Sequence, residues 1–179
     1  MKEIAGTSEK NNYKIMFFDE GRFGLMSSLK RLWSEKGKSC EVKVKQGYKN
    51  FYVYTSVDIR NGESFSLLLP EVNTKMMNLY LEELSKEYKD KKILLIMDQA
   101  GWHKSKKLKV PENIEIEYQP PYSPELNPVE RLWKWLKNNT IHNRIFEKLE
   151  DILNAVCEEL KKMTKEKFME LCRCSYVTF

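Results

Sequence analysis

The unbroken apolar run from Ile93 to Met97 constrains the fold of this chain more than any other segment. Successive side chains of a strand point to opposite faces of a sheet, so this run predicts a central strand that is buried on both faces. A sheet buried on both faces needs a layer on each side, and helices usually supply those layers. The run ends at Asp98, whose charge requires a compensating partner if it is buried.

Other segments show the two-residue period of strands or the 3.6-residue period of helices. Strand patterns cover residues 13–19, 40–45, 51–57, 64–69 and 114–118, and Asn61-Gly62 is a hairpin turn signal. Helical stripes are formed by Met77, Leu81, Leu84 and Tyr88, with Asn73 or Thr74 as the cap, by Val129, Leu132, Trp133 and Leu136, and by Leu149, Ile152, Leu153, Val156 and Leu160. We expect residues 20–40 to be irregular. The order of these elements predicts an α/β fold, a mixed sheet flanked by helices.

The length of 179 residues and the hydrophobic content of 41% predict one globular domain. We expect residues 1–12 to be a flexible N-terminus and residues 13–179 to form a single domain. The sequence contains no apolar run long enough to cross a bilayer, which argues against a membrane partner. Its four cysteines are too irregularly spaced for a disulfide framework or a zinc site, which indicates thiols in a reducing cytoplasm.

The positive charge of the chain is concentrated in one segment. Residues 30–49 contain seven lysine or arginine residues and two glutamates, whereas the net charge of the whole chain is +5. This segment also contains Trp33 and Tyr48, and its lysines, including Lys43 and Lys45, suit contacts with a phosphate backbone. A solvated lysine-rich loop and strand explains the same composition equally well.

Asp19 and Asp98 each follow an apolar strand pattern directly. We expect both at the C-terminal ends of their strands, where open sheets of this kind usually keep their active sites. Each has a structural alternative: Asp19 as a turn former, and Asp98 paired with Lys104 or a backbone cap instead of a metal ion. Glu20 competes with Asp19 for the same role, but strand alternation places the two side chains on opposite faces.

Glu130 lies in the first turn of the helix that follows a proline-rich turn. One interpretation is a capping box, with Asn127 as the N-cap, Pro128 at N1 and Glu130 at N3. In the other, the apolar stripe sets the helix orientation, so that Glu130, Lys134 and Lys137 share a different face. That face suits a metal ion beside a nucleic-acid backbone, and also an ordinary exposed Glu–Lys surface.

Together, Asp19, Asp98 and Glu130 are suited to hold a pair of Mg²⁺ ions, which prefer oxygen ligands. Two ions about 4 Å apart activate the attacking oxygen and stabilise the leaving oxygen at a phosphodiester. Other chemistries have less support, because the chain has no Gly-x-Ser-x-Gly elbow and no Gly-rich phosphate loop.

Three segments carry these acids: Phe17-Phe18-Asp19-Glu20-Gly21-Arg22-Phe23, Leu95-Ile96-Met97-Asp98-Gln99-Ala100-Gly101-Trp102-His103-Lys104-Ser105, and Pro120-Pro121-Tyr122-Ser123-Pro124-Glu125-Leu126-Asn127-Pro128-Val129-Glu130-Arg131-Leu132-Trp133. At these residues the chain resembles the DDE transposases of bacterial insertion sequences in the mariner-related superfamily. The third segment is the most specific, since the order Tyr-Ser-Pro-Glu-Leu-Asn-Pro-x-Glu is hard to reach by chance. The resemblance implies the catalytic domain of a DDE superfamily endonuclease, with a ribonuclease-H-like fold in which helices flank a mixed five-stranded sheet.

The resemblance also implies that Asp19, Asp98 and Glu130 are the catalytic and metal-binding residues of a DNA endonuclease and strand transferase. It implies two Mg²⁺ ions per active site, with Mn²⁺ as a substitute, which serve to cut transposon ends and to join the freed 3′-hydroxyl to a target. The expected partners are DNA (transposon ends and target), a second copy of the chain in a homodimer, and a separate or missing DNA-binding domain. In this interpretation the N-terminal helix-turn-helix domain of relatives is absent from the chain, and the protein associates with the nucleoid.

Basic and aromatic residues near the triad are expected to support it. DNA phosphates are the expected contacts of Lys104, Lys106, Lys107, Lys109, Lys134, Lys137, Lys43 and Lys45. Trp102 and His103 either pack beside the site or touch DNA. Trp133 fits the buried stripe, whereas Trp135 lies off it and suits a stacking or partner surface. Two other functions stay open: a different two-metal nuclease on the same fold, and a non-catalytic relic that only binds DNA or another subunit.

Overall fold

The computed structural model describes residues 13–25, 49–142, 144 and 146–174, and its centre is a mixed five-stranded sheet. The strands are β1 (Tyr13–Gly24), β2 (Asn50–Val57), β3 (Ser64–Leu69), β4 (Lys92–Met97) and β5 (Ile114–Tyr118), in the spatial order β3-β2-β1-β4-β5. β2 is antiparallel to β1 and β3, whereas β4 is parallel to β1 and β5. The predicted mixed sheet is confirmed. The strand expected at residues 40–45, with Lys43 and Lys45, lies outside the described residues.

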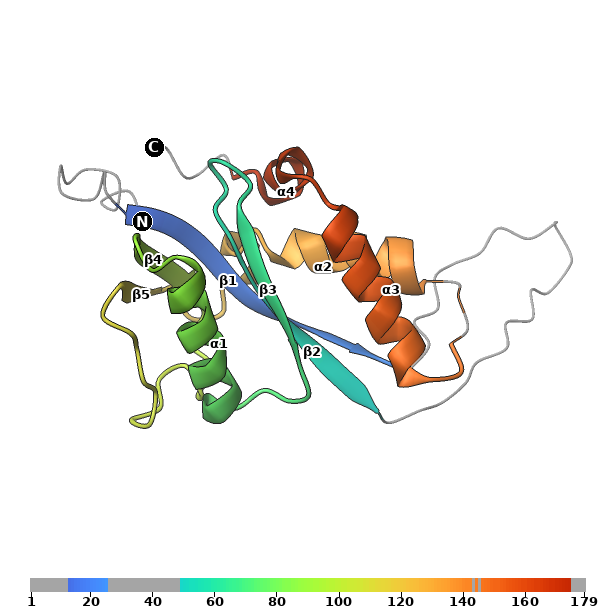
Figure 1. Ribbon diagram of the computed structural model, residues 1–179, viewed down its shortest axis with the longest axis horizontal. Helices are drawn as coiled ribbons and strands as arrows, with labels where there is room; N and C mark the ends of the chain where they lie inside the picture. The colour runs from blue at the N-terminus through green and yellow to red at the C-terminus, as the bar shows by residue number, and fades with distance from the viewer. Residues whose placement is uncertain (1–12, 26–48, 143, 145, 175–179) are drawn as a thin grey trace, which may run out of the picture.

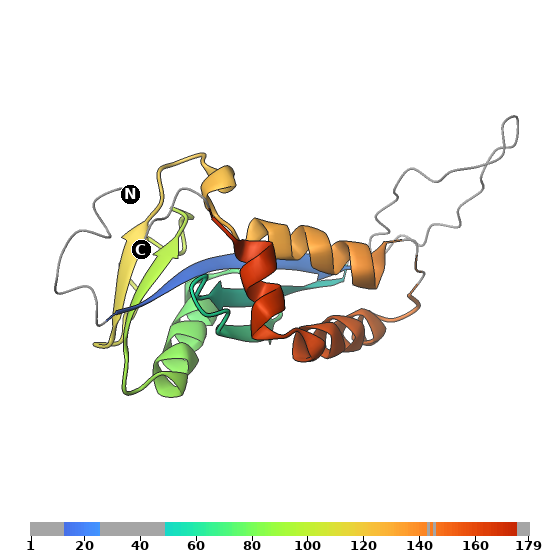
Figure 2. The same cartoon turned by 90° about the horizontal axis from the view of Figure 1, so that it is seen from above.

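Helices cover both faces of the sheet, as the apolar run in β4 predicts. They are α1 (Thr74–Glu87), α2 (Glu130–Leu136), α3 (Leu149–Lys162) and α4 (Lys165–Cys172), with a 3-10 turn at Pro124–Leu126 and a π-helical turn at Lys137–Ile141. Figure 1 shows strands β1 to β3 between α1 on one side and α3 and α4 on the other, and Figure 2 shows α2 alongside β1. In the described part of the chain, no helix combines the length and the apolar character needed to cross a membrane.

Strand alternation along β1 divides the core into two parts. Phe17 packs on the face covered by α2, α3 and α4, whereas Met16 and Phe18 pack on the face covered by α1. β4 is divided in the same way, with Ile96 on the first face and Leu95 on the second. The parity of a residue in β1 or β4 therefore decides which helical layer its side chain meets.

β1 is longer than predicted, and Asp19 lies inside it instead of at its end. β1 pairs with β4 only as far as Phe17 and Ile96, but its pairing with β2 continues to Gly24 and Asn50. The antiparallel partner supplies backbone hydrogen bonds to residues 20–24, so the prediction of irregular structure there is wrong. Apolar content falls after Phe18, and a pattern based on apolar residues therefore ends the strand too early.

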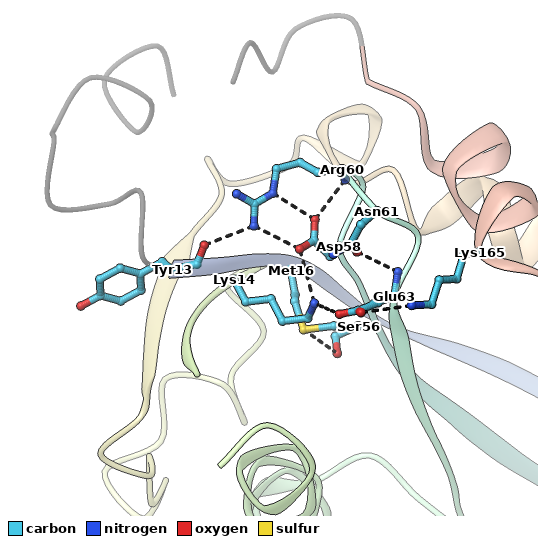
Figure 3. Close-up of polar contacts among 9 residues, drawn as sticks. All are labelled: Tyr13, Lys14, Met16, Ser56, Asp58, Arg60, Asn61, Glu63 and Lys165. Carbon is cyan, nitrogen blue, oxygen red and sulfur yellow. Dashed lines mark hydrogen bonds and ion pairs between the residues drawn. The ribbon is translucent and has the colours of Figure 1, made fainter. Parts of the chain in front are cut away.

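A cluster of charged side chains, in which Lys14 and Asp58 are buried, joins the start of β1 to the β2–β3 turn and to α4 (Figure 3). Asp58, whose side chain is 1% exposed, accepts hydrogen bonds of 3.1 Å from Arg60 and lies 3.6 Å from Lys14 Nζ. Lys14 also donates to Glu63, and Glu63 forms an ion pair of 3.1 Å with Lys165 of α4. Each charge has an opposite charge beside it, so the cluster acts as a structural tie between three distant segments.

Replacing Asp58 with asparagine is expected to lower the free energy of unfolding by about 3 kcal/mol, because removing one partner of a buried ion pair leaves the other charge uncompensated. Urea denaturation of Asp58→Asn beside the wild type measures this change. Glu83→Gln is the matched control, since it removes one carboxylate from an exposed pair with Lys86 and should leave stability nearly unchanged. Equal stability of Asp58→Asn and the wild type would contradict the role of the cluster.

Candidate active site

The register between β1 and β4 places Asp19 beside Asp98. Phe17 pairs with Ile96, and each aspartate lies two residues further along its chain segment. Paired residues of parallel strands point to the same face, which here is the face that α2 covers. Asp98 directly follows the last residue of β4, as predicted, whereas Asp19 is held within β1 by its pairing with Thr55.

Glu130 is the first residue of α2, and the proline-rich turn before it brings it to the two aspartates. All three carboxylates line one pocket with a volume of about 450 Å³. The remaining lining residues come from the segment after β4 and from the turn before α2: Gln99, Ala100, Gln119, Pro120, Pro121, Tyr122, Ser123, Pro124 and Asn127. Three acids from widely separated parts of the chain therefore meet at one site.

Asn127 ties the start of α2 to β1 and does not form a capping box. Its side-chain amide donates to the Phe18 carbonyl at 2.8 Å, and its side-chain oxygen accepts from the Val129 N–H at 3.2 Å. The backbone N–H of Asn127 donates to the carbonyl of Pro124 instead of to a Glu130 carboxylate. The capping-box interpretation is therefore wrong, because α2 begins at Glu130 and the asparagine is used to hold the turn against the sheet.

Asp19 is poorly solvated and lies close to other carboxylates. Burial raises the pKa of Asp19 to about 8, with a further increase from the Glu130 charge and an opposing effect of a hydrogen bond from Trp133. In that hydrogen bond, Trp133 Nε1 donates to Asp19 Oδ2 at 2.7 Å. Without a cation the Asp19 carboxyl is therefore mainly protonated at neutral pH, and a bound cation would favour its charged form.

Trp133 serves the core and the pocket at the same time. It is 4% exposed, which confirms its predicted place in the core. The apolar stripe of α2 predicts only that Trp133 is buried. It does not predict the hydrogen bond to Asp19. Gly21 makes room for the ring, since a Cβ at this residue would lie 2.6 Å from Trp133. The indole also meets the ring of Phe23 edge to face.

His103 joins Asp98 to Glu20, although Glu20 lies in β1 and Asp98 lies just after β4. The imidazole is 1% exposed, with Nδ1 2.7 Å from Asp98 Oδ1 and Nε2 2.9 Å from Glu20 Oε1. The same Glu20 oxygen accepts a hydrogen bond of 3.0 Å from Trp102 Nε1. We name Glu20, Trp102 and His103 the β1–β4 clasp, because they connect the strand of Asp19 to the segment of Asp98.

The main partner of Asp98 is His103 and not Lys104. The ammonium of Lys104 donates instead to Gln99 Oε1 at 2.7 Å. Asp98 also accepts a hydrogen bond from the Ala100 N–H at 3.1 Å, so a backbone N–H is a second partner of this carboxylate. The hydrogen bond from His103 keeps the pKa of Asp98 below its usual value, although partial burial opposes this.

The two carboxylates beside the imidazole of the clasp favour its charged form. Burial lowers the pKa of His103, but hydrogen bonds to Asp98 and Glu20 outweigh this effect and raise it to about 9. The imidazolium form can donate from both ring nitrogens, one to each carboxylate. Glu20 lies on the opposite face from Asp19, as predicted, and only Asp19 lines the pocket. Glu20 nevertheless acts on the site through His103, a role that no spacing in the sequence indicates.

Four of the lysines predicted to contact DNA lie on the segment after β4, and Lys109 is exposed like the other three. Lys104, Lys106 and Lys107 are all exposed. The Asn78 side chain on α1 donates to the Lys107 carbonyl at 3.1 Å and accepts from the Lys109 N–H at 2.8 Å. These hydrogen bonds hold the basic segment on the α1 side of the sheet.

Two further predicted lysines, Lys134 of α2 and Lys137 of the π-helical turn after it, lie on the other side of the sheet. Lys134 is exposed, and the Lys137 ammonium lies 5.6 Å from the centre of the Phe23 ring. Trp135 is partly buried against the core, and the Lys167 ammonium of α4 lies 5.5 Å from its ring. α4 therefore occupies part of the surface that Trp135 was expected to offer to a partner. The described lysines form two groups and not one continuous patch.

The pocket has the carboxylate side chains that a divalent-cation site needs, but they are not yet close enough together to bind one ion. Among the residues that the structure describes, no three Asp, Glu, His or Cys side chains are already close enough to hold one ion together. The donor set nevertheless fits a hard cation, because it consists of carboxylates and includes Asp19, whose charged form is unfavourable in isolation. His103 occupies Asp98 Oδ1, which leaves the second oxygen of Asp98 for a ligand bond.

Two comparisons of sequence connect the chain to known proteins. The sequence model of a family described as DDE superfamily endonuclease matches residues 14–153. The uncharacterized protein y4pE/y4sA of Sinorhizobium fredii (strain NBRC 101917 / NGR234) is 40% identical over 116 residues, which cover 64% of this chain and 86% of that protein.

Solved structures of Mos1 share the fold at low sequence identity. The Mos1 strand transfer complex is 15% identical, with a TM-score of 0.68 over 91% of this chain and 51% of the Mos1 chain. The Mos1 mariner paired-end complexes with Mn and with Mg are each 16% identical, with TM-scores of 0.70 and 0.69 over 89% of this chain and 51% of theirs. The expected ribonuclease-H-like fold is confirmed, and the chain spans about half the length of the Mos1 chains.

Alanine at Gly21 is expected to displace Trp133 and to break its hydrogen bond to Asp19. Overpacking of this kind lowers the free energy of unfolding by about 1–3 kcal/mol, which denaturation followed by tryptophan fluorescence measures. Gly101→Ala is the matched control, since nothing lies within 4 Å of a Cβ there, and it should change stability by less than about 1 kcal/mol. If the two variants are equally stable, Gly21 is not required to admit the indole.

Proposed function

Because the chain belongs to the DDE superfamily of endonucleases, as the resemblance of its motifs indicates, we propose that it is a transposase catalytic domain. In this proposal it cuts DNA phosphodiester bonds and joins the freed 3′-hydroxyl ends to a target. The observation that carries the proposal is the common pocket of Asp19, Asp98 and Glu130, which come from β1, the end of β4 and α2. Carboxylates gathered in this way are a ligand set for hard divalent cations.

Asp19, Asp98 and Glu130 would hold two Mg²⁺ ions, or Mn²⁺ in their place. When bound, such ions activate the attacking oxygen and stabilise the leaving oxygen at a phosphodiester. The Mos1 paired-end complexes were solved with Mn and with Mg, which supports the use of divalent metals by this chain.

The neighbouring residues hold the three carboxylates in place. Trp133 donates one hydrogen bond to Asp19 from a buried ring, and His103 of the β1–β4 clasp holds one oxygen of Asp98. Such outer hydrogen bonds orient ligands and are usually required for full metal affinity. Glu130 is exposed at the start of α2 and is therefore the ligand that can move most easily toward a cation.

DNA is the proposed substrate. Mos1 was solved as a strand transfer complex and as a paired-end complex with a transposon end, which supports transposon ends and a target duplex as partners here. The exposed Lys104, Lys106 and Lys107, in the segment that follows Asp98, are suited to phosphate contacts. In this proposal, recognition of the end sequence belongs to a DNA-binding domain distinct from this catalytic domain, and two ends are paired by a homodimer; the Mos1 paired-end complexes support the pairing.

The alternatives are a different ribonuclease-H-like nuclease and a non-catalytic relic. Reaction products separate the first from a transposase, because only a transposase joins a 3′-hydroxyl end to a target duplex. Metal binding separates the second, because a relic with a collapsed site would not bind Mn²⁺ through the triad. The convergence of all three acids on one pocket favours an enzyme over a relic.

Mn²⁺-dependent nicking of supercoiled plasmid tests the proposal directly. We expect the wild type to nick and Asp98→Asn to lose more than about 100-fold of the rate, because loss of a residue outside the ligand shell already costs about 10–100-fold. Asp90→Asn is the matched control, because Asp90 is also exposed but precedes β4, whereas Asp98 follows it. This variant should nick like the wild type.

If both the wild type and Asp98→Asn are inactive, calorimetric titration with Mn²⁺ is the next measurement. Binding that is lost in Asp98→Asn would mean that the metal site is present but that cleavage needs the separate DNA-binding domain. A wild type that binds no Mn²⁺ would favour the relic.

Neutralising Lys106 and Lys107 together is expected to weaken binding to duplex DNA of any sequence. The slope of log affinity against log salt should become shallower by about 2, one unit for each lost phosphate contact. Fluorescence anisotropy over a series of salt concentrations measures both quantities. Lys89→Gln, an exposed lysine before β4, is the control and should leave the slope unchanged. An unaltered slope in the double variant would place the DNA backbone elsewhere.

A further inference from the structure

The pocket carries one aromatic side chain that nothing in the described structure covers. Tyr122 has a relative exposure of 101%, whereas the other exposed large apolar residues of the described segments, Leu79 and Val110, reach 40% and 44%. Tyr122 lines the same pocket as the three carboxylates. A fully exposed ring obtains no stabilisation from burial, so the hydrophobic core does not explain its presence beside the acids.

The backbone of Tyr122 is in an unfavourable conformation for its side chain. Its φ is 58°, and no other non-glycine residue in the described part of the chain has a positive φ. Glycine or asparagine adopts this region at lower energy, so the shape of the turn alone does not account for a tyrosine. Strained residues persist where the surrounding structure holds them, and they concentrate at functional sites.

The loop around Tyr122 holds the ring at a defined place. Three prolines restrict the backbone on both sides of it: Pro120, Pro121 and Pro124. Gln119, only 3% exposed, donates its backbone N–H to the Met97 carbonyl at 2.8 Å and its side-chain amide to the Leu126 carbonyl at 2.9 Å. The loop is therefore anchored at the end of β4, directly before Asp98. A ring presented in this way loses little conformational freedom when a ligand binds.

We propose that Tyr122 is a stacking platform for an unpaired nucleobase of the DNA strand whose phosphate lies at the carboxylates. The inference rests on the proposed function and specifies the form of DNA that the pocket accepts, a duplex with a single-stranded end at the reacting phosphate. The two parts of the pocket suit the two parts of a nucleotide: acids that hold cations at the phosphate, and an exposed ring with prolines at the base. Stacking accepts every base, because each has a π face.

Two DNA probes and two variants test this inference on the full chain. One probe is a hairpin duplex with a four-nucleotide 3′ single-stranded tail that contains 2-aminopurine, and the other is the same duplex with a blunt end. Tyr122→Asn removes the ring and keeps a residue that tolerates a positive φ. Tyr122→Phe keeps the ring. Binding is measured by anisotropy with Ca²⁺ in place of Mg²⁺, and stacking by quenching of 2-aminopurine fluorescence.

We expect Tyr122→Asn to bind the tailed duplex about 5- to 150-fold more weakly than the wild type and to lose the quenching. Tyr122→Phe should behave like the wild type, and all three proteins should bind the blunt duplex alike. Equal binding of the tailed duplex by Tyr122→Asn and the wild type would overturn the inference, as would an equal loss on both probes. Neither measurement requires cleavage, so this test can be carried out even if the nicking assay fails. If the protein nicks DNA but Tyr122→Asn has no effect, the inference is refuted and the proposed function is not.

Discussion

The first half of β1 pairs in parallel with β4, and its second half pairs antiparallel with β2. The pairing with β4 stops before Asp19, so no strand lies beside Asp19 on that side. This arrangement has two effects on the site. Asp19 is held rigidly by β2, because it is an internal residue of a long strand. On the other side β4 has ended, so the place where a continuing strand would lie is open for the segment of Asp98 and for the pocket. The proline-rich turn and α2 form the other wall of the pocket, and Asn127 of this turn donates a hydrogen bond to the Phe18 carbonyl.

The two aspartates meet in one pocket but stand in opposite electrostatic environments. Asp19 is half-buried beside Trp133, and desolvation and the nearby Glu130 carboxylate raise its pKa, whereas the hydrogen bond from His103 lowers the pKa of Asp98. A divalent cation would remove this difference, because its charge compensates for the solvation that Asp19 lacks. The β1–β4 clasp also has a structural role. It connects the α1 face of β1 to the segment after β4, and so couples the positions of Asp19 and Asp98.

Much of the fold could be predicted, because most elements carry a local signal. The apolar run of β4 and the stripes of α1 and α3 result from burial on one or two faces, which periodicity records directly. The Asn61-Gly62 turn is signalled by a glycine, which adopts a φ of 70° there. The predictions that were wrong concern residues whose conformation or contacts depend on a partner far away in the sequence. β1 continues beyond its apolar part because β2 is beside it. Asn127, in one interpretation the cap of its own helix, instead donates to a carbonyl of β1.

By itself, the sequence determined that this chain forms a mixed α/β sheet and that Asp19, Asp98 and Glu130 belong together, because strand patterns and the motif around Glu130 are local properties. Only the tertiary structure decided which groups touch these acids. Glu20 and His103 are separated by 83 positions and Asp19 and Trp133 by 114, yet each pair shares a hydrogen bond. Contacts of this kind depend on strand register and helix docking, which the cooperative packing of the whole core sets and no short segment encodes.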